Sequence, residues 1–308
     1  MLRAATTFAS DGSFDEEAFR TYLSRFVEAG LGVYLASGGS GEGHTLTWEE
    51  LYQVYRVGVG VCKGKVPVLS NQPEQYTARA TIEHAHLAIE AGVDAVNIYG
   101  PVGSHGEAAN ETEYRAYFDH VLTEIAFPVV VALSTAEAYC PPARAIAAIC
   151  NKHAQVTAIN VLPPPVGVLA DTYFLSLRDA LTRDVEIYVH YPGALTLLEM
   201  GAAGTIGNEP NILPKTFRRL GDAYRARELQ EFTRIYSDIR RFTQYVLQWG
   251  RTPRWIKVAM KAFNIPGCGL REPFTMPEQP ELERFAVGAL ALNIPEISEI
   301  AKEGGLLA

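Results

Sequence analysis

Apolar and polar residues along this chain follow two spacings, one typical of helices and one typical of buried strands. Phe19, Tyr22 and Phe26 recur at helical spacing and share one face of a predicted helix. Gly30 follows as a residue suited to end that helix in a left-handed conformation, and the unbroken apolar run Val33–Leu35 comes next. The pattern predicts an amphipathic helix that leads directly into a buried strand.

The same joint occurs three times. Glu28–Val33 reads Glu-Ala-Gly-Leu-Gly-Val, Glu90–Ala95 reads Glu-Ala-Gly-Val-Asp-Ala, and Glu199–Gly204 is a third version. Each copy places a glycine between the end of a helical stretch and the start of an apolar run. Repeated helix-to-strand joints indicate βα units and a parallel sheet.

Eight segments have the composition and spacing of strands: Arg3–Thr6, Gly32–Leu35, Pro67–Ser70, Ala95–Tyr99, Pro128–Leu133, Val156–Val161, Glu186–His190 and Gly204–Gly207. Amphipathic stretches at 77–90, 112–125, 143–153 and 173–181 alternate with them. This alternation predicts an α/β fold, a (β/α)8 TIM barrel that we assign to residues 1–221. A doubly wound open sheet is the alternative, but the Gly-x-Gly-x-x-Gly sequence expected after its first strand is absent.

Beyond residue 210 the pattern becomes helical. Helices are predicted at 224–247, 253–263, 281–292 and 296–303. These helices exceed what is needed to close a barrel, and no low-complexity linker precedes them. We therefore expect a C-terminal helical extension, residues 222–308, that packs on the barrel.

Composition narrows the class of protein. The 308 residues carry a net charge of −8, which argues against nucleic-acid binding as the main function. The four cysteines form no C-x-x-C pair, as is typical of reduced thiols in the cytosol. No apolar run is long enough to span a bilayer, and the N-terminus lacks the apolar core of a signal peptide. We expect a cytoplasmic protein with neither membrane nor nucleic-acid partners.

A glycine-rich segment carries the clearest chemical signal. Gly38–Glu42, Gly-Gly-Ser-Gly-Glu, follows the second predicted strand and precedes a predicted helix start at Trp48. Its glycines let backbone N–H groups approach a ligand, and the dipole of the following helix favours an anion. We expect Gly39, Ser40 and Gly41 to bind a carboxylate or phosphate. The alternative is a tight turn without a ligand.

Together these features resemble the dihydrodipicolinate synthase / N-acetylneuraminate lyase superfamily over nearly the whole chain. Thr6–Phe8 and the turn Asp11-Gly12 resemble the first strand of that family and the turn after it. Gly38–Glu42 resembles its Gly-[Thr/Ser]-Thr-Gly-Glu motif, and Gly201–Ile206 resembles the approach to its eighth strand. The late helices are similar to the C-terminal extension of the family.

The resemblance implies a pyruvate-type carboxylate on the glycine-rich turn, a Schiff-base lysine at the end of strand six and an acid/base tyrosine at the end of strand five. This sequence departs from that pattern, because Asn160 stands at the lysine position and Ala132 at the tyrosine position. The remaining lysines belong to helix-to-strand segments or to the late helices: Lys63, Lys65, Lys152, Lys215, Lys257, Lys261 and Lys302. Since an amide cannot form an imine, we expect no Schiff-base chemistry.

Other residues at predicted strand ends supply the candidate chemistry. Asn160 is a candidate donor that polarises a substrate carbonyl, or alternatively a satisfied core amide. His190 and Tyr191 follow strand seven and are candidates for proton transfer. Tyr99 is a candidate substrate contact, although a tyrosine there also fits a packing role with a polar tip. We expect Glu42 to cap the following helix or to brace the turn.

Three functions remain open. We favour a lyase or aldolase-like enzyme, without imine or cofactor, that acts on a small 2-oxo acid or related carboxylate. The second is a non-catalytic ligand-binding pseudoenzyme of the same fold. The third is a metal-dependent aldolase or hydrolase using His44, His105 and His190, whose spacing gives no positive signal, so we expect no metal. The resemblance also implies a homo-oligomer, a dimer or a homotetramer.

Overall fold

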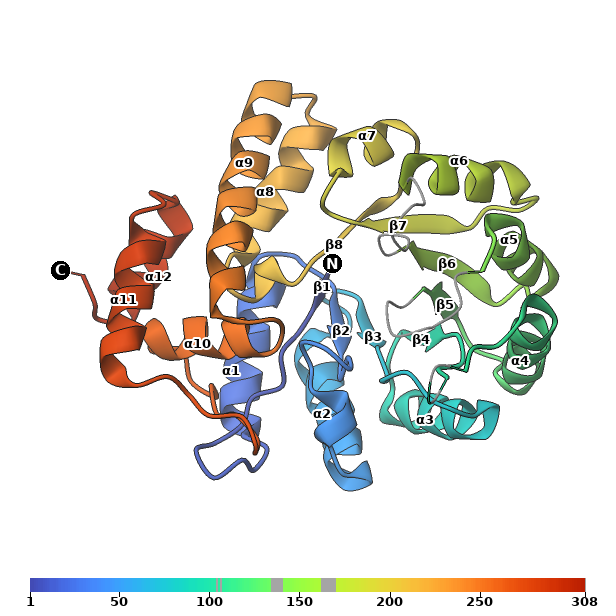
Figure 1. Ribbon diagram of the computed structural model, residues 1–308, viewed down its shortest axis with the longest axis horizontal. Helices are drawn as coiled ribbons and strands as arrows, with labels where there is room; N and C mark the ends of the chain where they lie inside the picture. Colours follow the sequence, from blue (N-terminus) through green and yellow to red (C-terminus); the bar gives the residue numbers. More distant parts are fainter. Residues whose placement is uncertain (104, 106, 134–140, 162–169, 308) are drawn as a thin grey trace. The chain divides into compact units, whose positions relative to one another are not determined.

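A computed structural model describes residues 1–103, 105, 107–133, 141–161 and 170–307 (Figure 1). Within these residues, eight strands form one sheet in the order in which they occur along the chain. Their bounds are β1 Leu2–Arg3, β2 Val33–Leu35, β3 Val68–Ser70, β4 Ala95–Tyr99, β5 Val129–Ala132, β6 Val156–Val161, β7 Glu186–His190 and β8 Gly204–Ile206. The pairing of β1 with β2, and each pairing from β3 to β8, is parallel. Parallel strands in chain order with helices between them confirm the predicted (β/α)8 TIM-barrel class.

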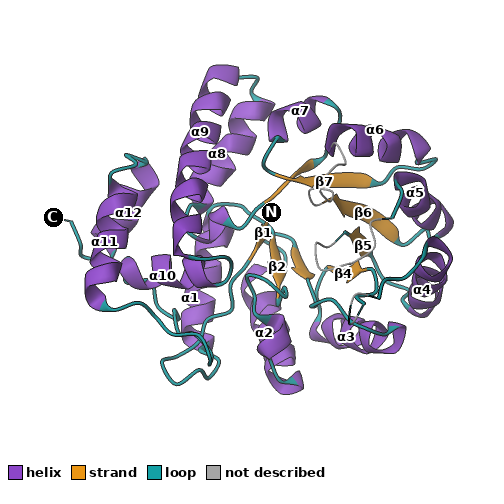
Figure 2. Ribbon diagram, viewed as in Figure 1, coloured by secondary structure: helices purple, strands orange, loops and turns teal. Residues whose placement is uncertain are grey.

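The helices alternate with the strands and then continue alone (Figure 2). Those between strands are α1 Glu16–Glu28, α2 Trp48–Cys62, α3 Ala78–Ala91, α4 Glu111–Glu124, α5 Ala143–Lys152, α6 Ala170–Ala180 and α7 Ala194–Glu199. After β8 come α8 Pro214–Arg225, α9 Leu229–Val246, α10 Arg254–Ala262, α11 Gln279–Leu290 and α12 Pro295–Glu303. None of the helices that the structure describes combines the length and apolar composition needed to cross a bilayer.

The three repeated joints have the backbone conformation that their glycines predicted. Gly30, Gly92 and Gly201 all have positive φ, at 67°, 98° and 103°. Residues with a β carbon are strained in this region, so glycine ends each helix and lets the chain turn into the next strand. The predicted βα repeat is therefore confirmed at all three joints.

Residues 69–207, with Met1, form one compact unit. In Figure 1, helices α3–α6 follow the outside of strands β4–β7. Val96 and Ile98 of β4 are fully buried, and they alternate with Asn97 and Tyr99, whose side chains point to the opposite face. In β4 the apolar residues and the polar Asn97 and Tyr99 therefore lie on opposite faces of the strand.

Residues 2–68 and 208–308 form the second compact unit, which holds β1, β2, α1, α2 and α8–α12. The predicted apolar face of α1 is buried, including Phe19, Tyr22 and Phe26. Asn211 connects the two segments of this unit. Its Oδ1 accepts hydrogen bonds from Ala5 N (2.9 Å) and Tyr22 Oη (2.8 Å).

Two predicted elements were wrong in detail. The first strand is only Leu2–Arg3: Ala4 N still donates to Tyr34 O of β2 at 2.9 Å, but by Thr7 the chain bonds outside the sheet, the Thr7 hydroxyl donating to Asp15 O. The helix predicted at 224–247 is broken between α8 and α9, where Arg227 has a φ of 60° that no α-helix can accommodate. The predicted division after residue 221 falls inside α8, and the division itself stays a prediction.

Candidate active site

The glycine-rich turn between β2 and α2 is fixed by hydrogen bonds to both sides of Gly41. Thr6 Oγ1 donates to Gly41 O at 2.6 Å, and Gly41 N donates to Ser37 Oγ at 2.9 Å. A β carbon on Gly41 would lie 2.5 Å from Ser37 N and would collide with the backbone. Glycine is therefore required at this position because the chain approaches itself too closely for any side chain.

Two backbone N–H groups of the same turn are available to a ligand. Among the residues that the structure describes, none accepts a hydrogen bond from Gly39 N or Ser40 N. The Ser40 hydroxyl, by contrast, donates to Asn208 Oδ1 at 3.0 Å. Two neighbouring backbone N–H groups suit the two oxygens of a carboxylate. The turn can therefore bind an anion through its backbone, while the Ser40 hydroxyl is engaged elsewhere.

A buried ion pair supports this turn. Lys257 of α10 is fully buried, and its Nζ lies 3.6 Å from Glu42 Oε1. Lys257 Nζ also donates to Thr6 O and, at 3.3 Å, to Gly267 O. Burial lowers the pKa of Lys257 to about 8 and raises the pKa of Glu42, while the opposite charge of each partner limits both shifts. The ammonium group thus connects the segment after β1 to the last residue of the glycine-rich turn.

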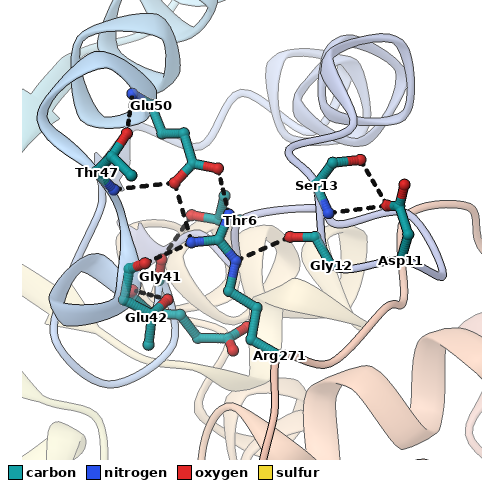
Figure 3. Close-up of polar contacts among 10 residues, drawn as sticks. Thr6, Asp11, Gly12, Ser13, Gly41, Glu42, Thr47, Glu50 and Arg271 are labelled. Atoms are coloured by element: carbon teal, nitrogen blue, oxygen red, sulfur yellow. Dashed lines mark hydrogen bonds and ion pairs between the residues drawn. The ribbon is translucent and has the colours of Figure 1, made fainter.

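Phe8 and Arg271 extend the same support. Lys257 Nζ lies 4.7 Å and Arg271 Cζ 4.2 Å from the centre of the Phe8 ring, both within cation–π range. In Figure 3 the Arg271 guanidinium reaches toward Glu50 of α2, with which it forms an ion pair, and toward Gly12 O at 2.9 Å. Arg271 therefore holds the start of α2 against the turn that follows β1.

Glu42 does not cap α2, so that part of the expectation was wrong. Thr47 is the N-cap: its Oγ1 accepts from Glu50 N at 3.2 Å, and Glu50 Oε2 accepts from Thr47 N at 2.9 Å. Glu42 has a left-handed φ of 52° and is 3% exposed, with its carboxylate facing Lys257. The bracing role is the one that its contacts fit.

A second group of candidates lies in the unit of residues 69–207. Tyr99, Ala132 and Asn160 are consecutive partners across β4, β5 and β6. In-register neighbours on parallel strands point to the same face, and His190 of β7 belongs to that face as well. Tyr191 is the next residue after His190 and is fully buried, with its ring 5.5 Å from the His190 ring. Tyr99, Asn160 and His190 therefore share one face of the sheet. Tyr191 comes directly after β7, at a position whose alternation is opposite to that of His190.

Asn160 lies in a buried environment and is already hydrogen-bonded. Its Nδ2 donates to Asn97 Oδ1 at 2.8 Å, and only 2% of the residue is exposed. The register also places Asn160 directly beside Ala132. The two positions at which the resemblance implied a lysine and a tyrosine are thus neighbours, occupied by an amide and a methyl group.

The three histidines of the metal hypothesis do not form a cluster in the described structure. His44 is exposed, and its Nδ1 hydrogen-bonds Gly38 O at 2.9 Å. His105 and His190 belong to the other compact unit. Among the described residues, no three His, Cys, Asp or Glu side chains are arranged to hold a metal ion.

Sequence reasoning missed Lys257 and Arg271. The sequence analysis placed Lys257 in the late helices without a role. It lies in the run Trp255–Met260, in which all the residues except Lys257 are apolar. A lysine inside so apolar a helical segment indicates a buried partner for its charge. That signal identifies an unusual lysine but not its partner, which is more than 200 residues away in the chain.

The fold and the turn define an α/β-barrel protein whose second βα loop presents free backbone N–H groups. The model of the dihydrodipicolinate synthetase family matches residues 1–289, and the chain belongs to that family. A 4-hydroxy-tetrahydrodipicolinate synthase of Hyphomonas neptunium is 28% identical over 284 residues, covering 90% of this chain and 92% of the relative. The synthase of Oleidesulfovibrio alaskensis is 24% identical over 303 residues, covering 94% and 97%.

Solved structures share the fold. Dihydrodipicolinate synthase of Aquifex aeolicus superposes with a TM-score of 0.83 at 17% identity, covering 96% of this chain and 98% of that one. The chloride-inhibited enzyme of Acinetobacter baumannii, complexed with pyruvate, gives 0.81 at 18% identity, covering 99% and 98%. Family membership confirms the predicted resemblance and a lyase-type class. The chemistry at Asn160 stays a prediction.

Proposed function

We propose that this protein is a lyase or aldolase-like enzyme that acts on a small 2-oxo acid or related carboxylate. The observation that carries the proposal is the pair of uncommitted N–H groups at Gly39 and Ser40, next to a turn braced by Lys257 and Glu42. Such donors match a carboxylate without any cationic side chain. The pyruvate bound in the Acinetobacter enzyme supports a ligand of this class.

The proposed chemistry proceeds without an imine. Asn160 would donate to the substrate carbonyl oxygen as negative charge develops on it. His190 or Tyr191 would move the proton, and Tyr99 would contact the substrate from β4. No amine takes part, because the matching position near the end of β6 is the amide Asn160.

Among the lysines that the structure describes, Lys257 is the buried one, and its burial invites comparison with a Schiff-base lysine. Its Nζ is fully buried and lies among the oxygens of Thr6, Gly267 and Glu42. Three oxygen neighbours favour the ammonium form, which is not nucleophilic, even though burial lowers its pKa to about 8. These contacts support a bracing role.

Borohydride trapping tests the mechanism. We expect pyruvate to raise the melting temperature of the wild-type protein, and borohydride with pyruvate to leave its intact mass unchanged. Peptide mapping accompanies the mass measurement. A reduced adduct on any lysine, Lys257 included, would refute the imine-free mechanism. Failure of every small carboxylate in a panel to bind would refute the proposed ligand class.

One observation favours the second candidate, a non-catalytic ligand-binding protein. The Asn160 amide donates to Asn97, as a satisfied core amide would. Turnover assays on each carboxylate that binds discriminate the two functions. Measurable turnover that is abolished in Asn160→Ala excludes the pseudoenzyme, while binding without turnover supports it.

We also propose a cytoplasmic homo-oligomer, a dimer or tetramer, on the basis of the family alone. Light scattering of the purified chain measures its mass in solution. A mass equal to one chain at micromolar concentration would refute the oligomer.

A further inference from the structure

Thr252 places a hydroxyl group beside the glycine-rich turn. It lies two residues before the start of α10, in the same compact unit as the turn. A β carbon on Gly39 would lie 3.3 Å from Thr252 Oγ1. Gly39 is exposed, whereas Ser40 and Gly41 are buried, and Thr252 itself is half-buried. Thr252 therefore packs against a part of the turn that a ligand can reach from solvent.

The Thr252 hydroxyl is available to such a ligand. Within the part of the chain that the structure describes, it has no hydrogen-bond partner. Two other threonine hydroxyls at the turn are engaged, since Thr6 Oγ1 donates to Gly41 O and Thr45 Oγ1 donates to Glu42 O at 2.8 Å. A carboxylate has about four acceptor positions. Thr252 thus adds a third donor to the two backbone N–H groups of Gly39 and Ser40.

Two arginines lie beside Thr252 in the chain. Arg251 precedes it and Arg254 follows it by two residues, so their Cα atoms lie within about 4 and 8 Å of the Thr252 Cα. Arg251 is exposed and Arg254 is half-buried. A β carbon on Gly250 would lie 2.9 Å from Arg254 Cδ, so the Arg254 side chain folds back along this segment toward Arg251.

Neither guanidinium group has a hydrogen bond or ion pair with the residues that the structure describes. Other arginines of the same unit each pair with a carboxylate: Arg218, Arg219, Arg225, Arg234 and Arg241. The buried Lys257 is likewise matched by Glu42. Two unmatched positive charges within four residues repel each other, and a bound anion would relieve that repulsion.

We propose that the ligand of the glycine-rich turn carries two anionic groups. Its first carboxylate accepts from Gly39 N, Ser40 N and Thr252 Oγ1. Its second group, a carboxylate or a phosphate, binds Arg251 and Arg254, whose planar guanidinium groups match either anion. The inference rests on the proposed function, because the first carboxylate is that of the 2-oxo acid. It adds that the substrate is a dianion.

Calorimetry with paired ligands tests the second anionic group. 2-Oxoglutarate and 2-oxopentanoate share a five-carbon chain and a ketone, but only the first has a second carboxylate. We expect 2-oxoglutarate to bind the wild type about tenfold more tightly, as for a hydrogen bond to a charged group. Glutarate and pentanoate repeat the comparison without the ketone, and 3-phosphoglycerate and glycerate repeat it for a phosphate.

The outcomes separate this inference from the proposed function. Equal affinities within all three pairs would refute the second anionic group alone. Failure of every ligand to bind would refute the carboxylate turn, and the proposed function with it. Preference for glutarate over pentanoate without turnover of any 2-oxo acid would refute the enzyme and support the dianion site.

Arginine variants assign the preference to these residues. We expect Arg251→Gln and Arg254→Gln each to reduce the preference for 2-oxoglutarate and to leave the affinity for 2-oxopentanoate unchanged. Arg56→Gln, which removes an exposed, unpaired arginine of α2, is the matched control and should keep the preference. The preference should also fall as salt rises from about 0.05 to about 0.5 M. A preference that survives in both arginine variants would refute their assignment.

Threonine variants test the first carboxylate. Thr252→Val keeps the shape of the side chain but removes the hydroxyl, so both members of each pair should bind about fivefold more weakly while their ratio stays the same. Thr252→Ser retains the hydroxyl and should bind as the wild type does. Wild-type affinities in a folded Thr252→Val variant would refute the role of the hydroxyl.

Discussion

Replacing Lys257 by methionine removes the counter-ion of a buried carboxylate while keeping most of the side-chain volume. Glu42, 3% exposed, would lose the ammonium group that lies 3.6 Å from its Oε1. Thr6 O would lose the donor that Lys257 supplies. We expect a large loss of stability whose size depends on pH.

The magnitude follows from the two forms available to Glu42. Leaving a buried charge without its partner costs about 3–5 kcal/mol. Protonating a carboxyl with an ordinary pKa of 4.5 costs about 4 kcal/mol at about pH 7.5, at ~1.36 kcal/mol per unit of pH. At about pH 5.5 the same protonation costs only about 1.4 kcal/mol. The folded variant therefore binds a proton that the unfolded chain releases, and its stability falls as pH rises.

Urea unfolding followed by circular dichroism measures this at both pH values. We expect Lys257→Met to lose about 4 kcal/mol relative to wild type at the higher pH and less than half of that at the lower one. Lys261→Met, an exposed lysine of the same helix, is the matched control. The double variant Lys257→Met/Glu42→Gln should recover most of the loss. A loss that is the same at both pH values, or below about 1 kcal/mol, would refute the buried-pair argument.

Three further predictions concern the same unit. The pKa of Lys257 is lowered from 10.5 to about 8, so between these pH values the unfolded chain binds more protons than the folded protein. The stability of the wild type should therefore rise with pH in this range, by up to ~3 kcal/mol. Urea titrations of wild type and Lys257→Met isolate this rise, and a rise that persists in the variant would contradict its assignment to Lys257. Gly41→Ala should abolish carboxylate binding measured by calorimetry, because its β carbon meets the backbone, whereas the exposed helical Gly60→Ala should bind normally. Asn211→Leu should destabilise the fold by about 3 kcal/mol in urea, since buried groups including Ala5 N lose their partner; a loss below about 1 kcal/mol would show that these groups find other partners.

Local chemistry explains which parts of the fold were predictable. The glycine joints at residues 30, 92 and 201 depend on a few neighbouring residues, because a left-handed backbone favours glycine wherever it occurs. Alternation of apolar and polar residues gave Ala95–Tyr99 its observed bounds. The helix break at Arg227 was missed because arginine has no intrinsic preference for the left-handed conformation it adopts there.

The candidate site was predictable only in part, because some of its features depend on neighbouring residues and others on contacts between distant ones. The glycine-rich turn could be read from five consecutive residues, since its close backbone approach requires glycine at Gly41. Asn160 could be identified as an amide in place of a lysine, but not as the end of a hydrogen-bonded chain. The position of Asn71 beside Asn97 depends on the sheet register, and the lack of an acceptor for its Nδ2 among the described residues could not be predicted from the sequence.

The sequence by itself determined the class of fold, the family and the glycine-rich turn, because these depend on short-range spacing and backbone preference. Only the tertiary structure decided that Lys257 pairs with Glu42, and that Asn71, Asn97 and Asn160 are joined through their side chains. Ion pairs and hydrogen bonds require contact within a few ångströms. Packing and register alone bring such distant residues together. The glycine-rich turn could therefore be predicted from the sequence, whereas the Lys257–Glu42 ion pair that supports it could not.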